Sequence, residues 1–300
     1  MIDKSPFPSQ DGSSIDSSRI IRADYKDLSY AALCVEAQSQ WRNGTGIWEG
    51  LGDEGRYSEC GLVLVADASG AQVEGMGGTE YVHRSMENVR ALLAETGVED
   101  VEDQVVELLD RKEIVEVCRT RGGGTGDSGY VNWTSGWADA EEAMRFVRAR
   151  CEEQRDIDFL TGEVVGIVER KVGAKHRGGE EESVVDGVEL SDGRVLRAGL
   201  TVLATGAWTP GLLDLEGRAN STGQVVAYVD VTEEEEERYE DMPVMLNLST
   251  GMSLYTPRDR KSNLRTCTCR PLRLPPFQRR PQNSAPLPRL RQQGPHPPPH

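Results

Sequence analysis

Two arginines three residues apart, Arg19 and Arg22, are the side chains of this chain best suited to bind a small anion. A guanidinium group is planar and offers paired donors that match a carboxylate. They flank two isoleucines, and on a helical turn residues at this spacing point to one side. The alternative is a surface pair bridged to Asp16 or Asp24. An anion site and a plain ion pair therefore both stay open.

A second chemical feature is the segment Leu200–Leu213, LTVLATGAWTPGLL. Its apolar run predicts a buried strand over Gly199–Ala204, followed through Gly206 by a helix with Pro210 in its first turn. Open α/β sheets bind ligands beyond the carboxyl ends of their strands, where a glycine lets a ligand approach the backbone. Gly206 and Trp208 are therefore candidate ligand contacts, although Trp208 is equally interpreted as a core aromatic behind the strand.

Other reactive residues give weaker signals. Ser13, Ser14 and Ser18 are short donors in a polar loop, and a turn-forming cluster explains them equally well. His83 and His176 stand alone in polar segments, which favours solvated side chains. No Ser-His-Asp arrangement or metal-ligand spacing is visible, so neither that hydrolytic chemistry nor a metal site is predicted. The glycine-rich residues 122–126 lack a preceding apolar strand and a following Lys-Ser/Thr, which favours a surface loop.

Charge divides the chain unevenly. The net charge is −16, but residues 258–300 hold ten Lys/Arg, one acidic residue and ten of the fifteen prolines, so the remainder carries −25. An acidic body argues against nucleic acid as a partner. The tail predicts disorder, with a polyanion-binding arm or a Pro-rich ligand for an SH3-type domain as alternatives. The abrupt change near Lys261 suggests an out-of-frame or mis-spliced terminus.

The remaining bulk properties bound the compartment. Cys34, Cys60, Cys118 and Cys151 are widely spaced, which favours buried free thiols over disulfides. No apolar run approaches transmembrane length, and the start Met1-Ile-Asp-Lys is not a signal peptide. The expectation is an intracellular protein, cytoplasmic or peroxisomal, without membrane partners.

Periodicity predicts alternating helices and strands. Helices are expected over residues 26–41, 79–96, 112–119, 139–154 and 232–239, with Asp27 capping the first. Strands are expected within residues 57–68, 129–133, 157–160, 164–168, 199–204, 223–231, 244–248 and 252–255, and a short strand or a turn over 105–109. A hairpin joins residues 184–190 to 195–196 across Ser191-Asp-Gly193.

Five separate segments, in order, resemble one family. They are DGSSIDSSRIIRADY at residues 11–25, GYVNW with GWADA at 129–140, EVVGI at 163–167, TGAW at 205–208 and STGQ at 221–224. Over roughly residues 1–257 the chain resembles D-amino-acid-oxidase-like flavoproteins, in the sarcosine oxidase and fructosyl amino acid oxidase group, and among these the fungal members.

The resemblance implies a role for each candidate residue. Asp3, with Lys4 beside it, would hold the ribose of FAD, although Asp3 is equally interpreted as an exposed terminal residue. Ser13, Ser14 and Ser18 would line the pyrophosphate or flavin. Val164 would hydrogen-bond the adenine through its backbone, and Gly206 and Trp208 would approach the flavin side. Arg19 would stabilise reduced, anionic flavin, and Arg22 would grip the substrate carboxylate.

The same resemblance predicts an α/β fold with gaps. The family's first strand and glycine-rich turn should precede Asp3, and further strands and a flavin-linking cysteine should follow Tyr255. The chain is therefore expected to be truncated at both ends. Residues 1–40 and 126–214 would form an incomplete Rossmann-type FAD domain, residues 41–125 and 215–257 an incomplete α+β substrate domain, and residues 258–300 a disordered tail.

The implied reaction is oxidation of the C–N bond of a secondary amine or N-substituted amino acid. Hydride would pass to FAD, and oxygen would be the acceptor, giving hydrogen peroxide. Substrates like sarcosine, pipecolate, saccharopine or fructosyl amino acids are all admissible. The alternatives are a non-catalytic fragment that binds no FAD, or a protein that recruits a partner through its Pro-rich tail.

Overall fold

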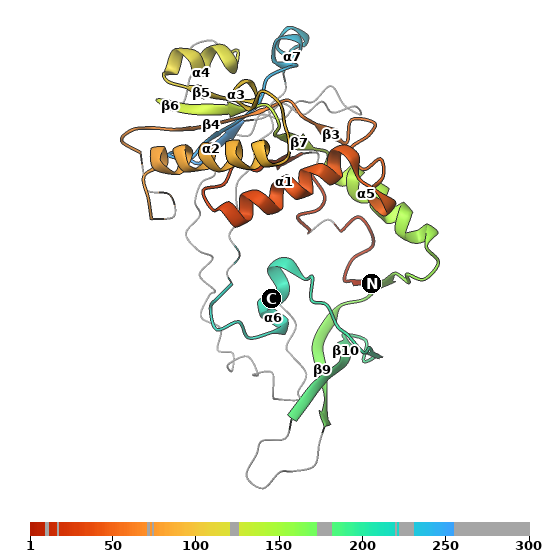
Figure 1. Ribbon diagram of the computed structural model, residues 1–300. Helices are drawn as coiled ribbons and strands as arrows, with labels where there is room; N and C mark the ends of the chain where they lie inside the picture. The colour runs from red at the N-terminus through yellow and green to blue at the C-terminus, as the bar shows by residue number, and fades with distance from the viewer. Residues whose placement is uncertain are drawn as a thin grey trace. The chain divides into compact units, whose positions relative to one another are not determined.

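A computed structural model describes the chain at residues 1–9, 12–16, 18–70, 73, 75–120, 126–172, 182–219, 221 and 231–254. These residues divide into two compact units, shown together in Figure 1. The first takes the described residues of 1–13 and 154–223, and the second those of 14–153 and 224–272. The tail 258–300 and His176 lie outside the described residues, as does most of the loop 122–126 and of the strand expected over 223–231.

The second unit is built on strand β4 (Leu62–Ala66), whose five residues are all buried. Among the described residues β4 lies in a five-stranded sheet of order β13-β12-β4-β6-β5, parallel to β12 and antiparallel to β6. Strands covered on both faces carry continuous apolar runs. Alternate β4 residues enter two clusters, with Leu64 on one face and Val65 on the other. The other strands are β5 (Val105–Leu108), β6 (Ser128–Asn132), β12 (Val244–Asn247) and β13 (Met252–Leu254).

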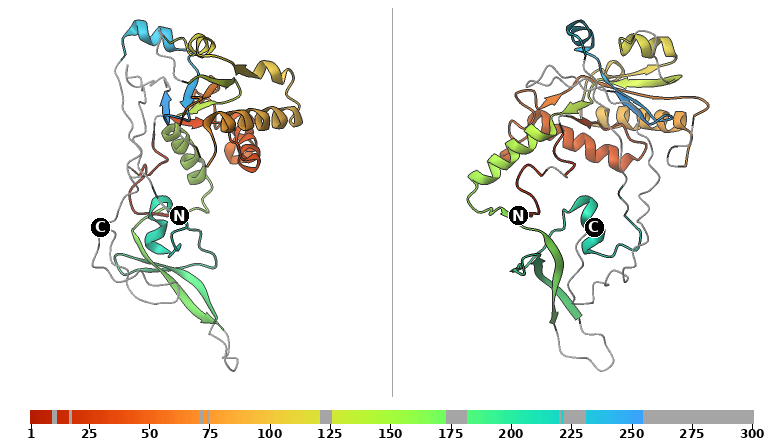
Figure 2. Two further views of the ribbon diagram at one scale, coloured as in Figure 1. Left: turned by 90° about the vertical axis from the view of Figure 1, so that its left-hand side faces the viewer. Right: turned by 180° about the vertical axis from the view of Figure 1, so that it is seen from behind.

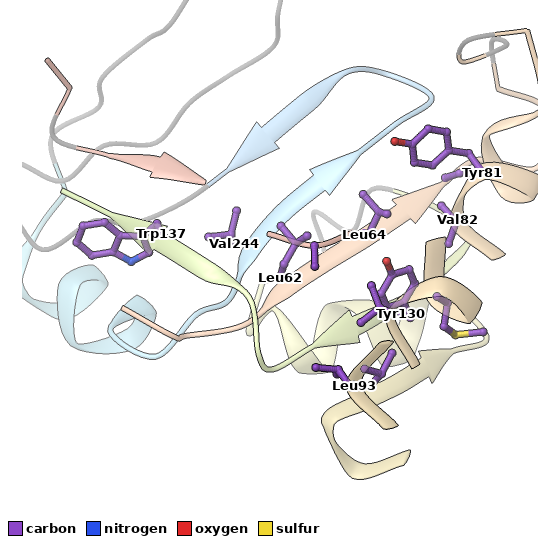
Figure 3. Packing of buried hydrophobic residues seen from close by; sticks show 13 residues of the cluster. Leu62, Leu64, Tyr81, Val82, Leu93, Tyr130, Trp137 and Val244 are labelled. Carbon is purple, nitrogen blue, oxygen red and sulfur yellow. The ribbon is translucent and has the colours of Figure 1, made fainter. Parts of the chain in front are cut away.

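Helices cover both faces of this sheet. Helix α2 (Gly78–Glu95) packs Tyr81, Val82 and Leu93 onto the face that carries Leu64 and Tyr130 (Figure 3), and α1 packs against α2. The views in Figures 1 and 2 place α4 and α7 on the opposite side of the sheet. The bounds are Leu28–Asn43 for α1, Val101–Gln104 for α3, Arg111–Val117 for α4 and Glu233–Tyr239 for α7.

Local signals start these helices close to the predicted positions. The Asp27 carboxylate accepts a hydrogen bond from the Tyr30 amide at 3.0 Å, which caps α1 as predicted. Asp110 caps α4 in the same way, through the Glu113 amide at 2.9 Å. Thr232 and Glu235 form a reciprocal capping box at the start of α7. The five predicted helices are all confirmed, each to within two residues at its ends.

A small sheet in the second unit carries the first arginine. Its order is β2-β7-β3, with β2 at Arg19–Ile21, β7 at Gly136–Ala138 and β3 at Tyr57–Ser58. Gly136 is required there, because a Cβ atom would collide with the Ser58 carbonyl oxygen. Helix α5 (Ala140–Glu153) follows β7, and a 3-10 turn, η1, spans Gly46–Trp48.

The described residues of the first unit form a parallel strand pair and an antiparallel sheet. Strand β1 (Ile2–Asp3) pairs parallel with β8 (Leu160–Thr161). Strand β10 (Glu182–Leu190) pairs with β9 (Val164–Val172) and across the predicted hairpin with β11 (Val195–Arg197). A 3-10 turn, η2 (Gly206–Trp208), leads into α6 (Thr209–Leu212), where Pro210 stands in the first turn as predicted.

Three local predictions are wrong. Residues 199–204 form no strand, and Leu200 and Val202 are 82% and 78% exposed, because no described strand pairs with this segment to bury it. Strand β8 begins only at Leu160 instead of spanning 157–160. Arg19 lies on an extended strand paired with Ala138, so the one-sided geometry of a helical turn does not apply to the arginine pair.

Candidate functional site

The predicted site residues fall into both units, and each group is described by itself. In the first unit, Asp3 and Lys4 are exposed at the carboxyl end of β1. The Gly162 amide donates to the Asp3 carbonyl oxygen at 2.8 Å, which continues the pairing with β8. The Asp3 carboxylate accepts from the Ser5 amide at 3.0 Å. Because β1 and β8 run parallel, their carboxyl ends meet at one edge, where α/β proteins bind ligands.

Lys4 and Trp208 meet although they are 204 positions apart in the chain. The Lys4 ammonium lies 4.3 Å from the centroid of the Trp208 ring, which is a cation–π contact. Trp208 is 37% exposed, so the interpretation as a core aromatic is wrong. Gly206 has a φ of +50°, and a Cβ atom added there would meet nothing within 4 Å. We call Asp3, Lys4, Gly206 and Trp208 the β1 cluster.

Val164, also in the first unit, is predicted to act through its backbone. Val164 is half-buried, begins β9 and pairs with Leu190 of β10. Next to it, the Ser191 amide donates to the Glu163 carbonyl oxygen at 2.8 Å. The strand start is thus fixed by the β9–β10 hairpin, and any role of Val164 would not depend on its side chain.

The three serines differ in their surroundings. Ser13 and Ser14 are exposed in a turn, as the turn-forming interpretation predicts. Ser18 is 1% exposed, and its Oγ has no hydrogen-bond partner among the described residues. A buried hydroxyl without a partner is unfavourable unless something else bonds to it. Of the three serines, Ser18 is therefore the one whose buried hydroxyl lacks a hydrogen-bond partner among the described residues.

The two arginines are held by nearby groups in the second unit. Arg19 forms an ion pair with Asp16, whose side chain is 14% exposed, as the surface-pair alternative predicts for this residue. Arg22 lies with its Cζ 4.0 Å from the centroid of the Tyr25 ring, and its Nη1 donates to the backbone carbonyl of Asp24. Arg22 is thus folded back over its own segment and half-buried.

Beside Arg22 lies a buried carboxylate, Asp24, which the sequence suggested only as a surface ion-pair partner of the arginines. Asp24 is fully buried, and its Oδ1 accepts from Tyr130 Oη at 2.8 Å and from Asn132 Nδ2 at 3.1 Å. Its Oδ2 accepts from Ser135 Oγ at 2.6 Å. Tyr130 Oη also shares a hydrogen bond with Ser85 Oγ at 2.8 Å. We call these five residues the Asp24 network; all five are fully buried.

The electrostatics of the Asp24 network follow from burial. Burial raises the pKa of Asp24, while its hydrogen bonds with Ser135, Tyr130 and Asn132 and the charge of Arg22 oppose that rise. Burial and the Asp24 charge raise the pKa of Tyr130 well above its usual value, so this phenol stays protonated. One signal for the network was present in the sequence, since Tyr130 and Asn132 alternate on a predicted strand and share one face.

Comparison with known proteins now identifies the family. Residues 1–286 match the family described as DAO, FAD dependent oxidoreductase. The chain belongs to this family. The resemblance found in the sequence is confirmed, and FAD is the cofactor that the family's description names.

Curated relatives are fungal oxidases. The chain is similar to amino acid oxidase imqH of Aspergillus flavus, with 30% identity over 250 residues that cover 81% of this chain and 51% of the relative. Amino acid oxidase fsqB of Aspergillus fumigatus is 27% identical over 262 residues, 81% of this chain and 48% of its own length. L-saccharopine oxidase of Schizosaccharomyces pombe is 23% identical over 252 residues. The chain thus spans about half the length of the curated relatives it matches.

Solved structures confirm the α/β fold class. Fructosamine oxidase (Amadoriase II) from Aspergillus fumigatus matches with a TM-score of 0.60 at 20% identity, over 88% of this chain and 54% of that one. A modified fructosyl peptide oxidase from Aspergillus nidulans matches with a TM-score of 0.61 at 21% identity, over 89% and 56%. No helix among the described residues is both long and apolar enough to span a membrane.

The described residues fit the family's cofactor in three respects. Lys4 is a cation that could pair with a phosphate, and the Trp208 ring beside it is an apolar surface. Gly206 leaves open space where a side chain would stand. In the second unit, taken by itself, Ser18 has a buried hydroxyl that lacks a partner among the described residues. These are donor types and open backbone suited to a flavin nucleotide.

Proposed function

We propose that this chain holds the FAD of an oxidase and binds the carboxylate of an amino-acid substrate. The whole protein would oxidise the C–N bond of a secondary amine or N-substituted amino acid. Bound FAD would supply the hydride acceptor, and its reoxidation by oxygen would give hydrogen peroxide. The substrate class is chosen because the relatives are named as amino acid, saccharopine and fructosamine oxidases.

The observation that carries the proposal is the meeting of Lys4 and Trp208 beside Asp3, in a chain of an FAD-dependent family. In this proposal Asp3 accepts hydrogen bonds from the ribose hydroxyls, and Lys4 neutralises phosphate charge. Gly206 allows the cofactor to approach the backbone, and Val164 bonds the adenine through its main chain. Trp208 packs against the cofactor and orients Lys4.

The proposal also assigns roles to the three serines and the two arginines. Ser18, with Ser13 and Ser14, would donate to the pyrophosphate or flavin. Arg19 would face the flavin ring and stabilise negative charge on it, and Arg22 would grip the substrate carboxylate. The domain assignment belongs to the same proposal: residues 1–40 and 126–214 for the cofactor, and residues 41–125 and 215–257 for the substrate.

FAD titration tests the cofactor assignment directly. We would measure quenching of FAD fluorescence by the full chain, and compare Lys4→Met and Trp208→Leu with Lys112→Met, an exposed lysine of the second unit. Losing a charge-assisted contact of about 1.5–3 kcal/mol weakens binding about tenfold to a hundredfold. Lys112→Met should leave the affinity unchanged.

Two results would contradict this proposal. The wild-type chain could fail to quench FAD, or Lys4→Met and Trp208→Leu could bind FAD as the wild type does. Peroxide formation from a panel of secondary amines and N-substituted amino acids, each with and without a carboxylate, then tests the reaction itself.

A further inference from the structure

We infer that Asp24 is a positioning residue: its buried carboxylate fixes the backbone turn that aims the Arg22 guanidinium at the substrate carboxylate. The inference rests on the proposed function of Arg22 and names the residue on which that function would depend. Asp24 itself would not touch the substrate, because its side chain is fully enclosed by protein.

The anchor is specific because every donor around Asp24 has a fixed direction. Asn132 Oδ1 accepts from the Thr134 amide at 3.0 Å and from Thr134 Oγ1 at 2.8 Å, so Asn132 Nδ2 must face Asp24. Asn132 Nδ2 also donates to Ser135 Oγ at 3.0 Å, which leaves the Ser135 hydroxyl proton for Asp24. Converging N–H and O–H donors require an acceptor with no proton of its own, which is a carboxylate.

The anchored backbone in turn holds Arg22. Arg22 Nη1 donates to the Asp24 carbonyl oxygen, and the guanidinium stacks on Tyr25, the next residue along. Asn88 Nδ2 donates to the carbonyls of Tyr25 at 3.1 Å and Lys26 at 2.9 Å, which pins the other end of the turn to α2. Both groups that hold the guanidinium therefore belong to a segment that the Asp24 side chain and Asn88 immobilise.

Charge strengthens the link between the two residues. Arg22 is the charged group that acts on the Asp24 carboxylate, and its positive charge lowers the pKa of Asp24 against the effect of burial. An Asp24→Asn substitution keeps the shape but removes the negative charge. It also replaces one of the two carboxylate oxygens by an amide NH2, which would face either Tyr130 and Asn132 or Ser135, and all three of these groups donate at present. The turn should therefore be released, and the guanidinium with it.

The test separates carboxylate binding from general damage. We would titrate the FAD-loaded full chain with pipecolate and N-methylglycine, and with the uncharged amide of each, by calorimetry. The affinity ratio of acid to amide reports how strongly the site prefers the carboxylate to an uncharged group of similar size. The inference predicts that Arg22→Gln abolishes the acid preference and that Asp24→Asn reduces it about tenfold. Ser85→Ala leaves the three donors to the Asp24 carboxylate in place, so it should lower the unfolding temperature and leave the ratio unchanged.

A second readout does not depend on activity. Nitrogen-15 NMR of the arginine side chains, with Arg22 assigned from Arg22→Lys, should show hindered rotation of the Arg22 guanidinium in the wild type and free rotation in Asp24→Asn. If Asp24→Asn does not fold, the wild-type spectrum decides, since a freely rotating Arg22 would overturn the inference.

The outcomes distinguish the inference from the proposed function. An acid preference that survives Asp24→Asn, with Arg22 still hindered, overturns the inference and leaves the function of Arg22 standing. No acid preference in the wild type removes the proposed role of Arg22. The NMR comparison then still decides whether Asp24 positions the guanidinium. A preference lost in Arg22→Gln and reduced in Asp24→Asn supports both.

Discussion

Replacing Tyr130 by Phe removes one oxygen atom from the middle of the Asp24 network. The ring is fully buried and stays the same size, so no cavity forms. The lost hydroxyl donates to Asp24 at 2.8 Å and shares a hydrogen bond with Ser85 at 2.8 Å. A hydrogen bond to a charged group contributes about 1.5–3 kcal/mol, and a stranded buried hydroxyl adds to the loss. We expect destabilisation of about 2–3 kcal/mol.

The assay is chemical and thermal unfolding of the full chain. For a protein of this size, each kcal/mol lowers the melting temperature by about 2–4 °C, so a decrease of about 5–10 °C is expected. The double variant Tyr130→Phe/Ser85→Ala is the matched control, because it removes the stranded Ser85 hydroxyl. Its destabilisation should be smaller than the sum of the two single effects. A loss below about 0.5 kcal/mol for Tyr130→Phe would refute this reasoning.

The same variant predicts a pH dependence with a definite sign. Burial raises the folded-state pKa of Asp24 above its unfolded value, so the stability this residue contributes is full at low pH and decreases as pH rises through the folded pKa. Tyr130 opposes that rise, because its hydrogen bond favours the ionised carboxylate. Removing it raises the pKa further, so the penalty of Tyr130→Phe should grow between about pH 4 and pH 7. An equal penalty at both ends would show that Asp24 does not titrate in this range.

Two further predictions test packing and thiol reactivity. Leu64→Ala should lower the free energy of unfolding by about 2–5 kcal/mol, because Leu64 is fully buried. Leu200→Ala should change it by less than about 0.5 kcal/mol, because Leu200 is exposed. A large loss for Leu200→Ala would indicate that residues 199–204 form a buried strand after all. Burial raises the pKa of Cys118 to about 12. Iodoacetamide at pH 8 should therefore modify the half-buried Cys151, while Cys118 reacts only on unfolding. Peptide mass spectrometry measures the labelling, and equal labelling of the two cysteines would contradict this prediction.

The sequence predicted elements well wherever the signal was local. Asp27 lies directly before a periodic apolar pattern, and it caps α1. Ser191-Asp-Gly193 lies between two alternating runs, and it joins β10 to β11. In both cases the groups that satisfy the backbone lie within a few residues of each other. Such signals can be predicted without knowing the rest of the fold.

The candidate site was less predictable because its contacts are long-range. Lys4 and Trp208 are brought together by packing that no spacing rule describes. Asp24 lies between Arg22 and Asp27, which the sequence already singled out. Its partners Tyr130, Asn132 and Ser135 are more than 100 positions away. Only the alternation of Tyr130 and Asn132 on one strand face hinted that polar atoms would gather there.

The failed strand at 199–204 and the correct strand β4 together show what an apolar run specifies. Both are short, mostly apolar runs, yet β4 is entirely buried while Leu200 and Val202 are largely exposed. β4 has a parallel neighbour, an antiparallel neighbour and a packed cluster on each face. The 199–204 run pairs with no described strand. A strand inside a sheet depends on neighbours that satisfy its backbone, so an apolar run gives the capacity for burial and its neighbours determine whether burial occurs.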